Sequence, residues 1–287
     1  MRGGGPILVL AGVLVAVVAP SAWAGTVEGP DLWVLAPDHA HETAVAVRDA
    51  FPRHLGAIER WLGVETEGHV QIHLVEGREA MQVVLGRWVG EWHVGGCSPP
   101  GTMAIRLDLL GSAPGSTLHG ILAHETVHHV LSQLPRPAPP RWFEEGLATY
   151  RAGGLSVSQR AWLERNWLLE HLPPLASFEP AEDGSIDDAA GLVYVTGLCA
   201  VEHLVALRGQ GGLRGLVARL GRGEPFDTAF RDAVGMDVAE FESRWRRGLA
   251  ERGHGASGIL PALLVFVAAL FAATAQGVRA MRARAAS

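Results

Sequence analysis

The chain has 287 residues, of which 48% are hydrophobic and 19% are charged, and its formal net charge is −6. This mildly acidic balance gives no reason to expect a nucleic acid as a partner, because nucleic-acid-binding proteins present basic surfaces to the phosphate backbone. Two strongly apolar runs, one near each end of the chain, point instead to export and to a membrane.

The N-terminus has the pattern of a secretory signal peptide. Arg2 is followed by an apolar run over residues 7–19, and Ala22 and Ala24 place small residues at the two positions that a signal peptidase recognises. We therefore predict a signal peptide over residues 1–24, cleaved after Ala24, with an uncleaved anchor as the alternative. In either case the domain that follows, residues 25–252, is expected to be exported.

Helix and strand patterns alternate in the next part of the chain. Apolar residues at helical spacing predict a helix over residues 38–62, and alternating apolar residues predict a strand over 70–75. A second helix is predicted over 79–85 and a second strand over 102–109. The stretch 95–101 between them is rich in glycine and proline and is predicted to be a loop.

A longer apolar helix follows, with Ser116 as its predicted N-cap, and it contains an HExxH pentad over residues 124–128. His124 and His128 are four residues apart and project from one face of the helix, so both rings can reach one zinc ion. Glu125 lies beside the first histidine, where it can accept a proton from a water on the metal, as the general base of a metalloprotease does. The alternative is a core helix whose histidines are solvated or hydrogen-bonded.

A catalytic zinc site needs a third protein ligand, so the chain has to return to the metal. A short helix is predicted over residues 141–150, and Glu144 and Glu145 lie near its start. Taken alone, two acidic residues there indicate only a charge that the helix dipole favours. The pentad together with the W-x-x-E-G-L-A sequence over residues 142–148, however, resembles the gluzincin metallopeptidases, and most closely the peptidase MA-like domains.

The resemblance implies a Zn²⁺ site with three protein ligands, His124, His128 and Glu145. It assigns the role of general base to Glu125, and Glu144 remains the alternative third ligand. Zinc bound in this way is the only cofactor that the sequence indicates.

The resemblance also implies an α+β, zincin-like fold. In this fold a small mixed sheet packs on the active-site helix, and a mostly helical C-terminal half follows. The last strand before that helix forms the edge of the sheet in the family and binds the substrate backbone as an added strand. We expect this role for residues 103–107, with an ordinary strand whose edge is covered as the alternative.

The C-terminal half is predicted to be helical, with segments over 162–169, 192–204, 213–220, 226–234 and 238–249 and an acidic surface loop over 179–188. In gluzincins a tyrosine or histidine from this part hydrogen-bonds the developing oxyanion. Tyr194 is the candidate for that role, and a packed core tyrosine is the alternative. His203 is a second, weaker candidate donor.

The end of the chain has the pattern of a membrane anchor. A glycine-rich linker over 253–258 leads to an uncharged apolar run, which predicts one transmembrane helix over 259–278. The arginines of residues 279–287 then place this short tail in the cytoplasm and the domain on the outside. A sorting signal that is later removed is the alternative.

Export also makes one disulfide possible between Cys97 and Cys199, the only two cysteines, although the sequence leaves open whether they pair.

Together these patterns predict an exported, membrane-anchored zinc metallopeptidase that hydrolyses peptide or protein substrates. Two other functions remain open at this point. The domain could be a catalytically silent metal-binding or interaction module, or it could hydrolyse a non-peptide amide through the same zinc site. The presence of Glu125 argues against the silent module, because zinc binding does not require that residue.

Overall fold

The computed structural model describes residues 25–91, 93–112, 116–135, 137–154, 173–178 and 190–253. The predicted signal peptide, the helix predicted over 162–169 and the acidic loop predicted over 179–188 lie outside these ranges. So do the predicted membrane helix, the tail, and all of the linker except Gly253, which is the last residue of a helix. Within the described ranges, no helix is both long enough and apolar enough to span a bilayer.

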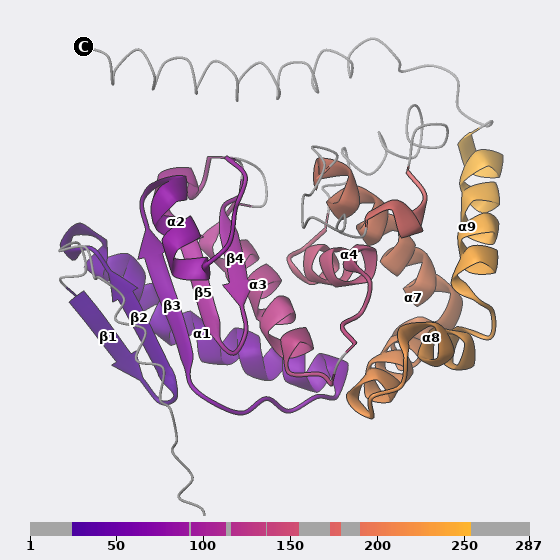
Figure 1. Ribbon diagram of the computed structural model, residues 1–287, viewed down its shortest axis with the longest axis horizontal. Coiled ribbons are helices and arrows are strands. Elements are labelled where there is room, and N and C mark those ends of the chain that lie inside the picture. The colour runs from indigo at the N-terminus through magenta and orange to yellow at the C-terminus, as the bar shows by residue number, and fades with distance from the viewer. Residues whose placement is uncertain are drawn as a thin grey trace, which may run out of the picture.

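A five-stranded mixed sheet forms the N-terminal half, in the strand order β1-β2-β3-β5-β4 (Figure 1). Its strands are β1 (Gly25–Gly29), β2 (Leu32–Ala36), β3 (Val70–Val75), β4 (Gly95–Ser98) and β5 (Thr102–Arg106). The central pairs β2–β3 and β3–β5 are parallel, whereas β1 and β4 run antiparallel to their neighbours at the two edges.

Seven α-helices complete the described structure and confirm the α+β class that the sequence predicts. They are α1 (His41–Leu62), α2 (Gly77–Leu85), α3 (Leu118–Ser132), α4 (Arg141–Arg151), α7 (Ala190–Gly221), α8 (Phe226–Val234) and α9 (Val238–Gly253). The helix predicted to begin with Ser116 begins one residue later, because the Thr117 side chain accepts the N–H of Gly120 and forms the N-cap.

The two faces of the sheet are covered by different helices, as the alternation of side chains along β5 requires. Met103 and Ile105 point to one face, where they share a core with residues of α1 and α3. Ala104 points to the other face and packs with Met81 and Leu85 of α2. The helix α3, which carries the HExxH pentad, is therefore fixed against the sheet along one side.

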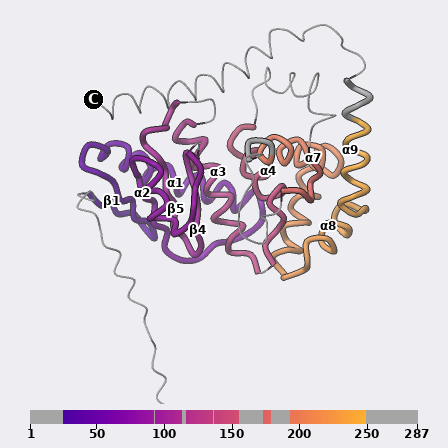
Figure 2. Tube along the Cα trace, turned by 45° about the horizontal axis from the view of Figure 1, so that its top comes forward, coloured from indigo at the N-terminus to yellow at the C-terminus, as the bar shows by residue number. Residues whose placement is uncertain are grey.

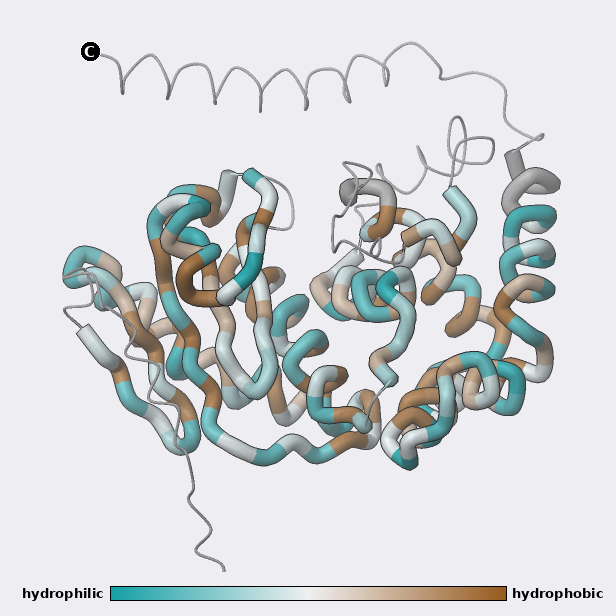
Figure 3. Tube along the Cα trace, viewed as in Figure 1, coloured by the Kyte–Doolittle hydropathy of each residue, from teal (hydrophilic) through white to brown (hydrophobic). Residues whose placement is uncertain are grey.

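The helices α4, α7, α8 and α9 form the second half, and α4 packs against α3 where this half meets the sheet half (Figure 2). Their shared core also takes in the ends of α1 and α3, so the two halves have a common interior. Its largest fully buried side chains are Trp142, Trp245, Phe143, Phe230 and Phe241. Hydrophobic and hydrophilic stretches alternate along these helices, as expected for helices with one buried face (Figure 3).

The strand β4 corrects two predictions. Residues 95–98 form a strand rather than part of a loop, because hydrogen bonding to β5 overrides the low strand propensity of two glycines. As a result β5 lies between β3 and β4, so residues 103–107 are not the sheet edge, and residues 107–109 form a 3-10 turn. Among the described strands, β4 is the outer strand on the side of the sheet next to α3.

The structure answers whether Cys97 and Cys199 pair, which the sequence left open. Cys97 lies in β4 and Cys199 in α7, both in described parts of the chain, and no disulfide joins them.

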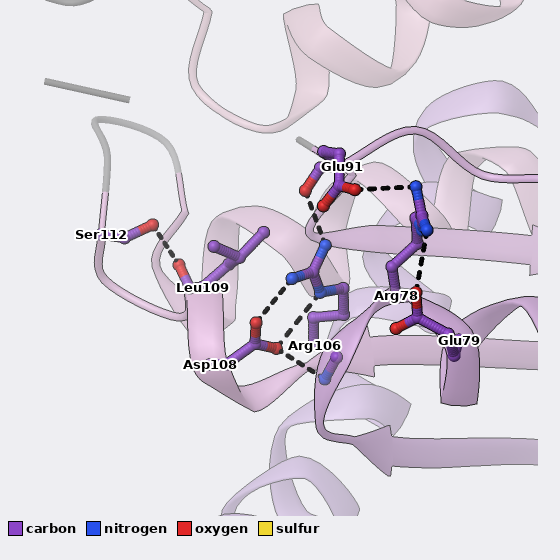
Figure 4. Close-up of polar contacts among 8 residues, drawn as sticks. Arg78, Glu79, Glu91, Arg106, Asp108, Leu109 and Ser112 are labelled. Atoms are coloured by element: carbon purple, nitrogen blue, oxygen red, sulfur yellow. Dashed lines mark hydrogen bonds and ion pairs between the residues drawn. The ribbon is translucent and has the colours of Figure 1, made fainter. Parts of the chain in front are cut away.

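A buried arginine fixes the segment that connects α2 to β4 (Figure 4). Arg106, at the end of β5, binds both carboxylate oxygens of Asp108 and donates from Nη1 to the main-chain carbonyl of Glu91 at 2.6 Å. Arg78 of α2 forms an ion pair with the Glu91 carboxylate at 2.7 Å. These contacts hold the described residues of this segment against the sheet, at the side where the candidate site lies.

Candidate metal centre

The helix α3 presents the pentad to the interior of the molecule. Glu125, Thr126 and His129 are buried, while His124 and His128 are partly buried one turn apart on the same face. The two rings meet edge to face, with centroids 4.9 Å apart, and their Nε2 atoms lie 3.2 Å from each other. Both nitrogens therefore converge on one point, as the spacing of four residues predicts.

The helix α4 supplies the third donor. It begins directly after Pro140, and Glu145 lies one turn into the helix, pointing back at the pentad. Its Oε2 lies 3.4 Å from Nε2 of His124 and 3.4 Å from Nε2 of His128. Among the described residues these three form a cluster that could hold a metal ion, which is the set of ligands that the sequence predicts.

The three donor atoms fit a tetrahedral metal site. They form a nearly equilateral triangle with sides of 3.2, 3.4 and 3.4 Å. In a tetrahedral site with bonds of about 2.1 Å, as zinc forms with histidine and glutamate, neighbouring ligand atoms lie about 3.4 Å apart. Among the described residues, the buried Oε2 of Glu145 meets only the two imidazoles at 3.4 Å and makes no hydrogen bond of good geometry, which is costly for a carboxylate unless a cation satisfies it. The site thus suits a cation bound by all three residues.

The charges at the site support the same conclusion. Burial opposes the ionisation of Glu145, yet His128 and His124 hold the pKa of its carboxyl well below its usual range. Burial also acts to lower the pKa of His128, but the negative charge of Glu145 raises it to about 9. An ionised carboxylate between two imidazoles favours a positive charge at this point.

Glu125, the general base that the pentad predicts, lies beside the triad, and its side chain fills a space next to β4. Glu125 is buried, and burial raises the pKa of its carboxyl above the usual range, as suits a group that accepts a proton near neutral pH. The space for its side chain exists because residue 95 of β4 is glycine. A Cβ atom at Gly95 would lie 2.5 Å from Oε1 of Glu125 and 2.8 Å from Ile121.

We expect Gly95→Ala to displace the Glu125 carboxylate while leaving the metal ligands in place. A shift of about 1 Å in a catalytic group can lower a rate about 100-fold, so the turnover of a cleaved peptide should fall on that order. Metal content and turnover are measured on the same preparation. Lower turnover with unchanged metal content shows that Glu125 has moved and that the metal ligands have not. Gly25→Ala is the control, because a Cβ there makes only an ordinary contact of 3.8 Å. Unchanged turnover in Gly95→Ala would contradict this role for the glycine.

Tyr194 of α7 reaches the site, whereas His203 does not line it. The Tyr194 ring lies 5.8 Å from that of His124 and forms part of the cleft wall. Burial, followed by the charges of Glu145 and Glu125, raises the pKa of Tyr194 well above its usual value, so the hydroxyl stays protonated and can donate a hydrogen bond. The His203 ring packs against Phe241 in the helical half.

Two glycines bring α4 and α7 into backbone contact and so place Glu145 near Tyr194. Gly146 follows the third ligand directly, and Gly197 lies one turn after the tyrosine. A Cβ atom at Gly146 would lie 2.3 Å from the main chain of Gly197, and one at Gly197 would lie 2.3 Å from the carbonyl oxygen of Trp142. No side chain larger than hydrogen fits at either position without separating the helices.

The donor triad opens into a cleft of about 410 Å³ between β4, α3 and α4. Its wall includes His93, which the sequence analysis did not single out because no motif surrounds it. Nδ1 of His93 accepts the N–H of Gly90 at 2.9 Å, so the neutral ring carries its proton on Nε2. Burial, and then the charge of Arg87, lower the pKa of His93 to about 4, which keeps the ring neutral.

Comparison with known families agrees with this geometry. The family model described as the Peptidase MA superfamily matches residues 54–251, which include every residue of the triad. The chain belongs to the Peptidase MA superfamily. Comparison with curated proteins gives no match. Membership of the Peptidase MA superfamily supports a metallopeptidase and a metal at His124, His128 and Glu145.

Proposed function

We propose that this chain is a zinc-dependent metallopeptidase of the gluzincin type, exported and anchored in a membrane. The observation that carries the proposal is the triangle of donor atoms from His124, His128 and Glu145, with Glu125 beside it. A metal-binding module without activity needs the triangle alone. The buried carboxylate of Glu125, and the glycine of β4 that makes room for it, favour hydrolysis.

His124, His128 and Glu145 would hold the ion, and zinc when bound would supply Lewis acidity that makes water a stronger acid and polarises a carbonyl group. Glu125 accepts the proton of the attacking water and then delivers it to the leaving amine. Tyr194 donates a hydrogen bond to the oxygen on which negative charge develops.

The substrate backbone adds to the open edge of β4. The Arg106 N–H donates to the Val94 carbonyl, so Val94 faces β5. Since residues in an antiparallel pair alternate in direction, the polar main-chain groups of Gly95 and Cys97 face away from β5. An extended peptide can pair with these groups while its scissile bond lies over the donor triad, which is the role first expected of residues 103–107.

Export and anchoring are supported by the two apolar runs of the sequence, over residues 7–19 and 259–278. The arginines after residue 278 orient the chain with the domain outside and the tail in the cytoplasm. The substrate is accordingly a peptide or protein outside the cytoplasm.

The decisive variant is Glu125→Gln, which removes the base and keeps the volume of the side chain. We expect peptide hydrolysis to fall by about 10²- to 10⁴-fold while about one zinc per chain is retained. Zinc is measured by mass spectrometry, and cleavage is measured with a mixed peptide library on the zinc-loaded full chain in detergent.

Three outcomes oppose the proposal in different ways. A folded chain that binds no zinc under these conditions contradicts the metal assignment. Zinc binding without cleavage by the unaltered protein favours an interaction module. Cleavage of amides other than peptide bonds, lost in Glu125→Gln, moves the substrate to another class.

A further inference from the structure

Arg87 lies at the mouth of the cleft on a rigid support. The helix α2 ends at Gly86, whose left-handed conformation (φ 64°) turns the chain toward β4. Ser98 of β4 donates its hydroxyl hydrogen to the Leu85 carbonyl at 2.9 Å. The position from which the Arg87 side chain extends is therefore fixed relative to the edge strand.

The Arg87 guanidinium reaches the outer side of that strand. Its Nη2 lies 3.5 Å from the carbonyl oxygen of Cys97, which is one of the groups that face away from β5. This contact is long, and a guanidinium has five N–H donors, so most of its hydrogen-bonding capacity remains for a ligand. Arg87 thus lies at the edge of the strand with which an added peptide would pair, and a peptide that pairs with the Cys97 carbonyl releases the guanidinium for another partner.

Arg87 also differs from the other arginines around the site in its charge partners. Arg141, on the opposite wall, lies 3.8 Å from Glu145, and Arg106 and Arg78 form ion pairs outside the cleft. Arg87 is exposed, and within the described ranges it makes no ion pair. Its charge nevertheless acts inside the cleft, since after burial it is the strongest influence that lowers the pKa of His93.

The balance of charge in the cleft favours an anionic ligand once the metal is bound. Its wall carries two arginines and three glutamates, and a divalent cation at the triad makes the total positive. Glu145 binds that cation, and Glu125 lies beside it. The cationic group left for a substrate is on the β4 side, at Arg87.

We propose that Arg87 binds a carboxylate of the substrate, so that the enzyme prefers peptides that place a carboxylate at this position. This inference rests on the proposed peptidase function and names the class of substrate for the same cleft. The planar guanidinium can form two parallel hydrogen bonds with a carboxylate, which gives geometric selection as well as attraction. The carboxylate is either an acidic side chain or the free C-terminus of the peptide.

Four peptides of one sequence distinguish these sources. They combine a central Glu or Gln with a free or an amidated C-terminus, and their binding to the zinc-loaded full-length Glu125→Gln protein is measured by titration calorimetry in detergent. We expect a carboxylate at the recognised position to tighten binding about tenfold over its amide. If the amidated Glu peptide binds more tightly than the amidated Gln peptide, the recognised carboxylate is a side chain. If the Gln peptide with a free C-terminus binds more tightly than the amidated Gln peptide, the recognised carboxylate is the C-terminus.

Arg87→Ala should abolish that preference, and Arg87→Glu should reverse it, so that the amide binds more tightly than the carboxylate. Arg53→Ala, which removes an exposed arginine of α1 outside the cleft wall, should leave the preference unchanged. Equal binding of all four peptides, or a preference that survives in Arg87→Ala, overturns the inference.

The same series separates this inference from the proposed function. If the enzyme with Glu125 intact cleaves the neutral and acidic peptides equally well, the peptidase function stands and the role of Arg87 fails. If the carboxylate preference in binding is present but no peptide is cleaved, the role of Arg87 in binding stands and the peptidase function fails.

Discussion

Glu145→Ala is expected to remove zinc from the protein, lowering its content from about one ion per chain to well below that value. The variant deletes the only carboxylate of the triad, and the two imidazoles that remain carry no compensating negative charge. Loss of a group that merely orients a zinc ligand weakens binding about 10- to 100-fold, so loss of the ligand itself should exceed that range. The measurement is zinc by mass spectrometry after dialysis, with circular dichroism to show that the fold is kept.

Glu144→Ala is the matched control for this variant. Glu144 precedes Glu145 on the same helix and also lines the cleft, so both variants remove one negative charge from the same region. Its side chain leaves the helix about 100° away from that of Glu145, and it is not part of the donor cluster. Zinc should therefore be retained in Glu144→Ala. If zinc is retained in Glu145→Ala and lost in Glu144→Ala, the third ligand is Glu144 rather than Glu145.

The histidine pair of the candidate metal site could be predicted from the sequence because its two residues lie at a local spacing. A separation of four residues on a helix places the side chains of His124 and His128 on one face, whatever the rest of the fold is. The assignment of Glu145 needed the resemblance to known metallopeptidases, since the spacing of 17 residues after His128 does not by itself bring two helices together. The structure places the three donor atoms at the corners of one triangle.

The edge of the sheet could not be predicted, because it is decided by pairing between distant segments. Residues 95–98 have the composition of a loop and become a strand only through their partners in β5. The hairpin of β1 and β2 was likewise not predicted, although it supplies two of the five strands. Helices of the second half, whose apolar residues repeat every three to four positions, were predicted closely, with α8 occupying residues 226–234 as expected.

The glycines near the site left only a weak signal in the sequence. Gly95, Gly146 and Gly197 each occupy a place where a Cβ atom would meet another part of the protein at 2.5 Å or less. A glycine inside a strand or helix pattern indicates a close approach, but it does not say what approaches. His93 left no signal, since its place in the cleft depends on the segment that Arg106 holds.

Gly197→Ala is expected to destabilise the protein by about 3 kcal/mol, at the upper end of the usual cost of overpacking. The added Cβ would lie 2.3 Å from the Trp142 carbonyl oxygen and 2.9 Å from the Gly146 nitrogen. Both are main-chain atoms of α4, so no side chain can rotate away and the helices have to separate. For a domain of this size the melting temperature should fall by roughly 6–12 °C, measured by calorimetry on the full chain.

Gly215→Ala, in the part of α7 beyond the kink at Gly209, tests whether the loss comes from the crossing of α4 and α7 rather than from a glycine-to-alanine change in a helix. A Cβ at Gly215 meets nothing within 4 Å, and alanine is the better helix former by up to about 1 kcal/mol, so this variant should be neutral or slightly more stable. Because the crossing also places Glu145 near Tyr194, zinc affinity should fall in Gly197→Ala and not in Gly215→Ala. Equal stability of the two variants would mean that α4 and α7 can separate at little cost, and that their contact does not hold the third ligand in place.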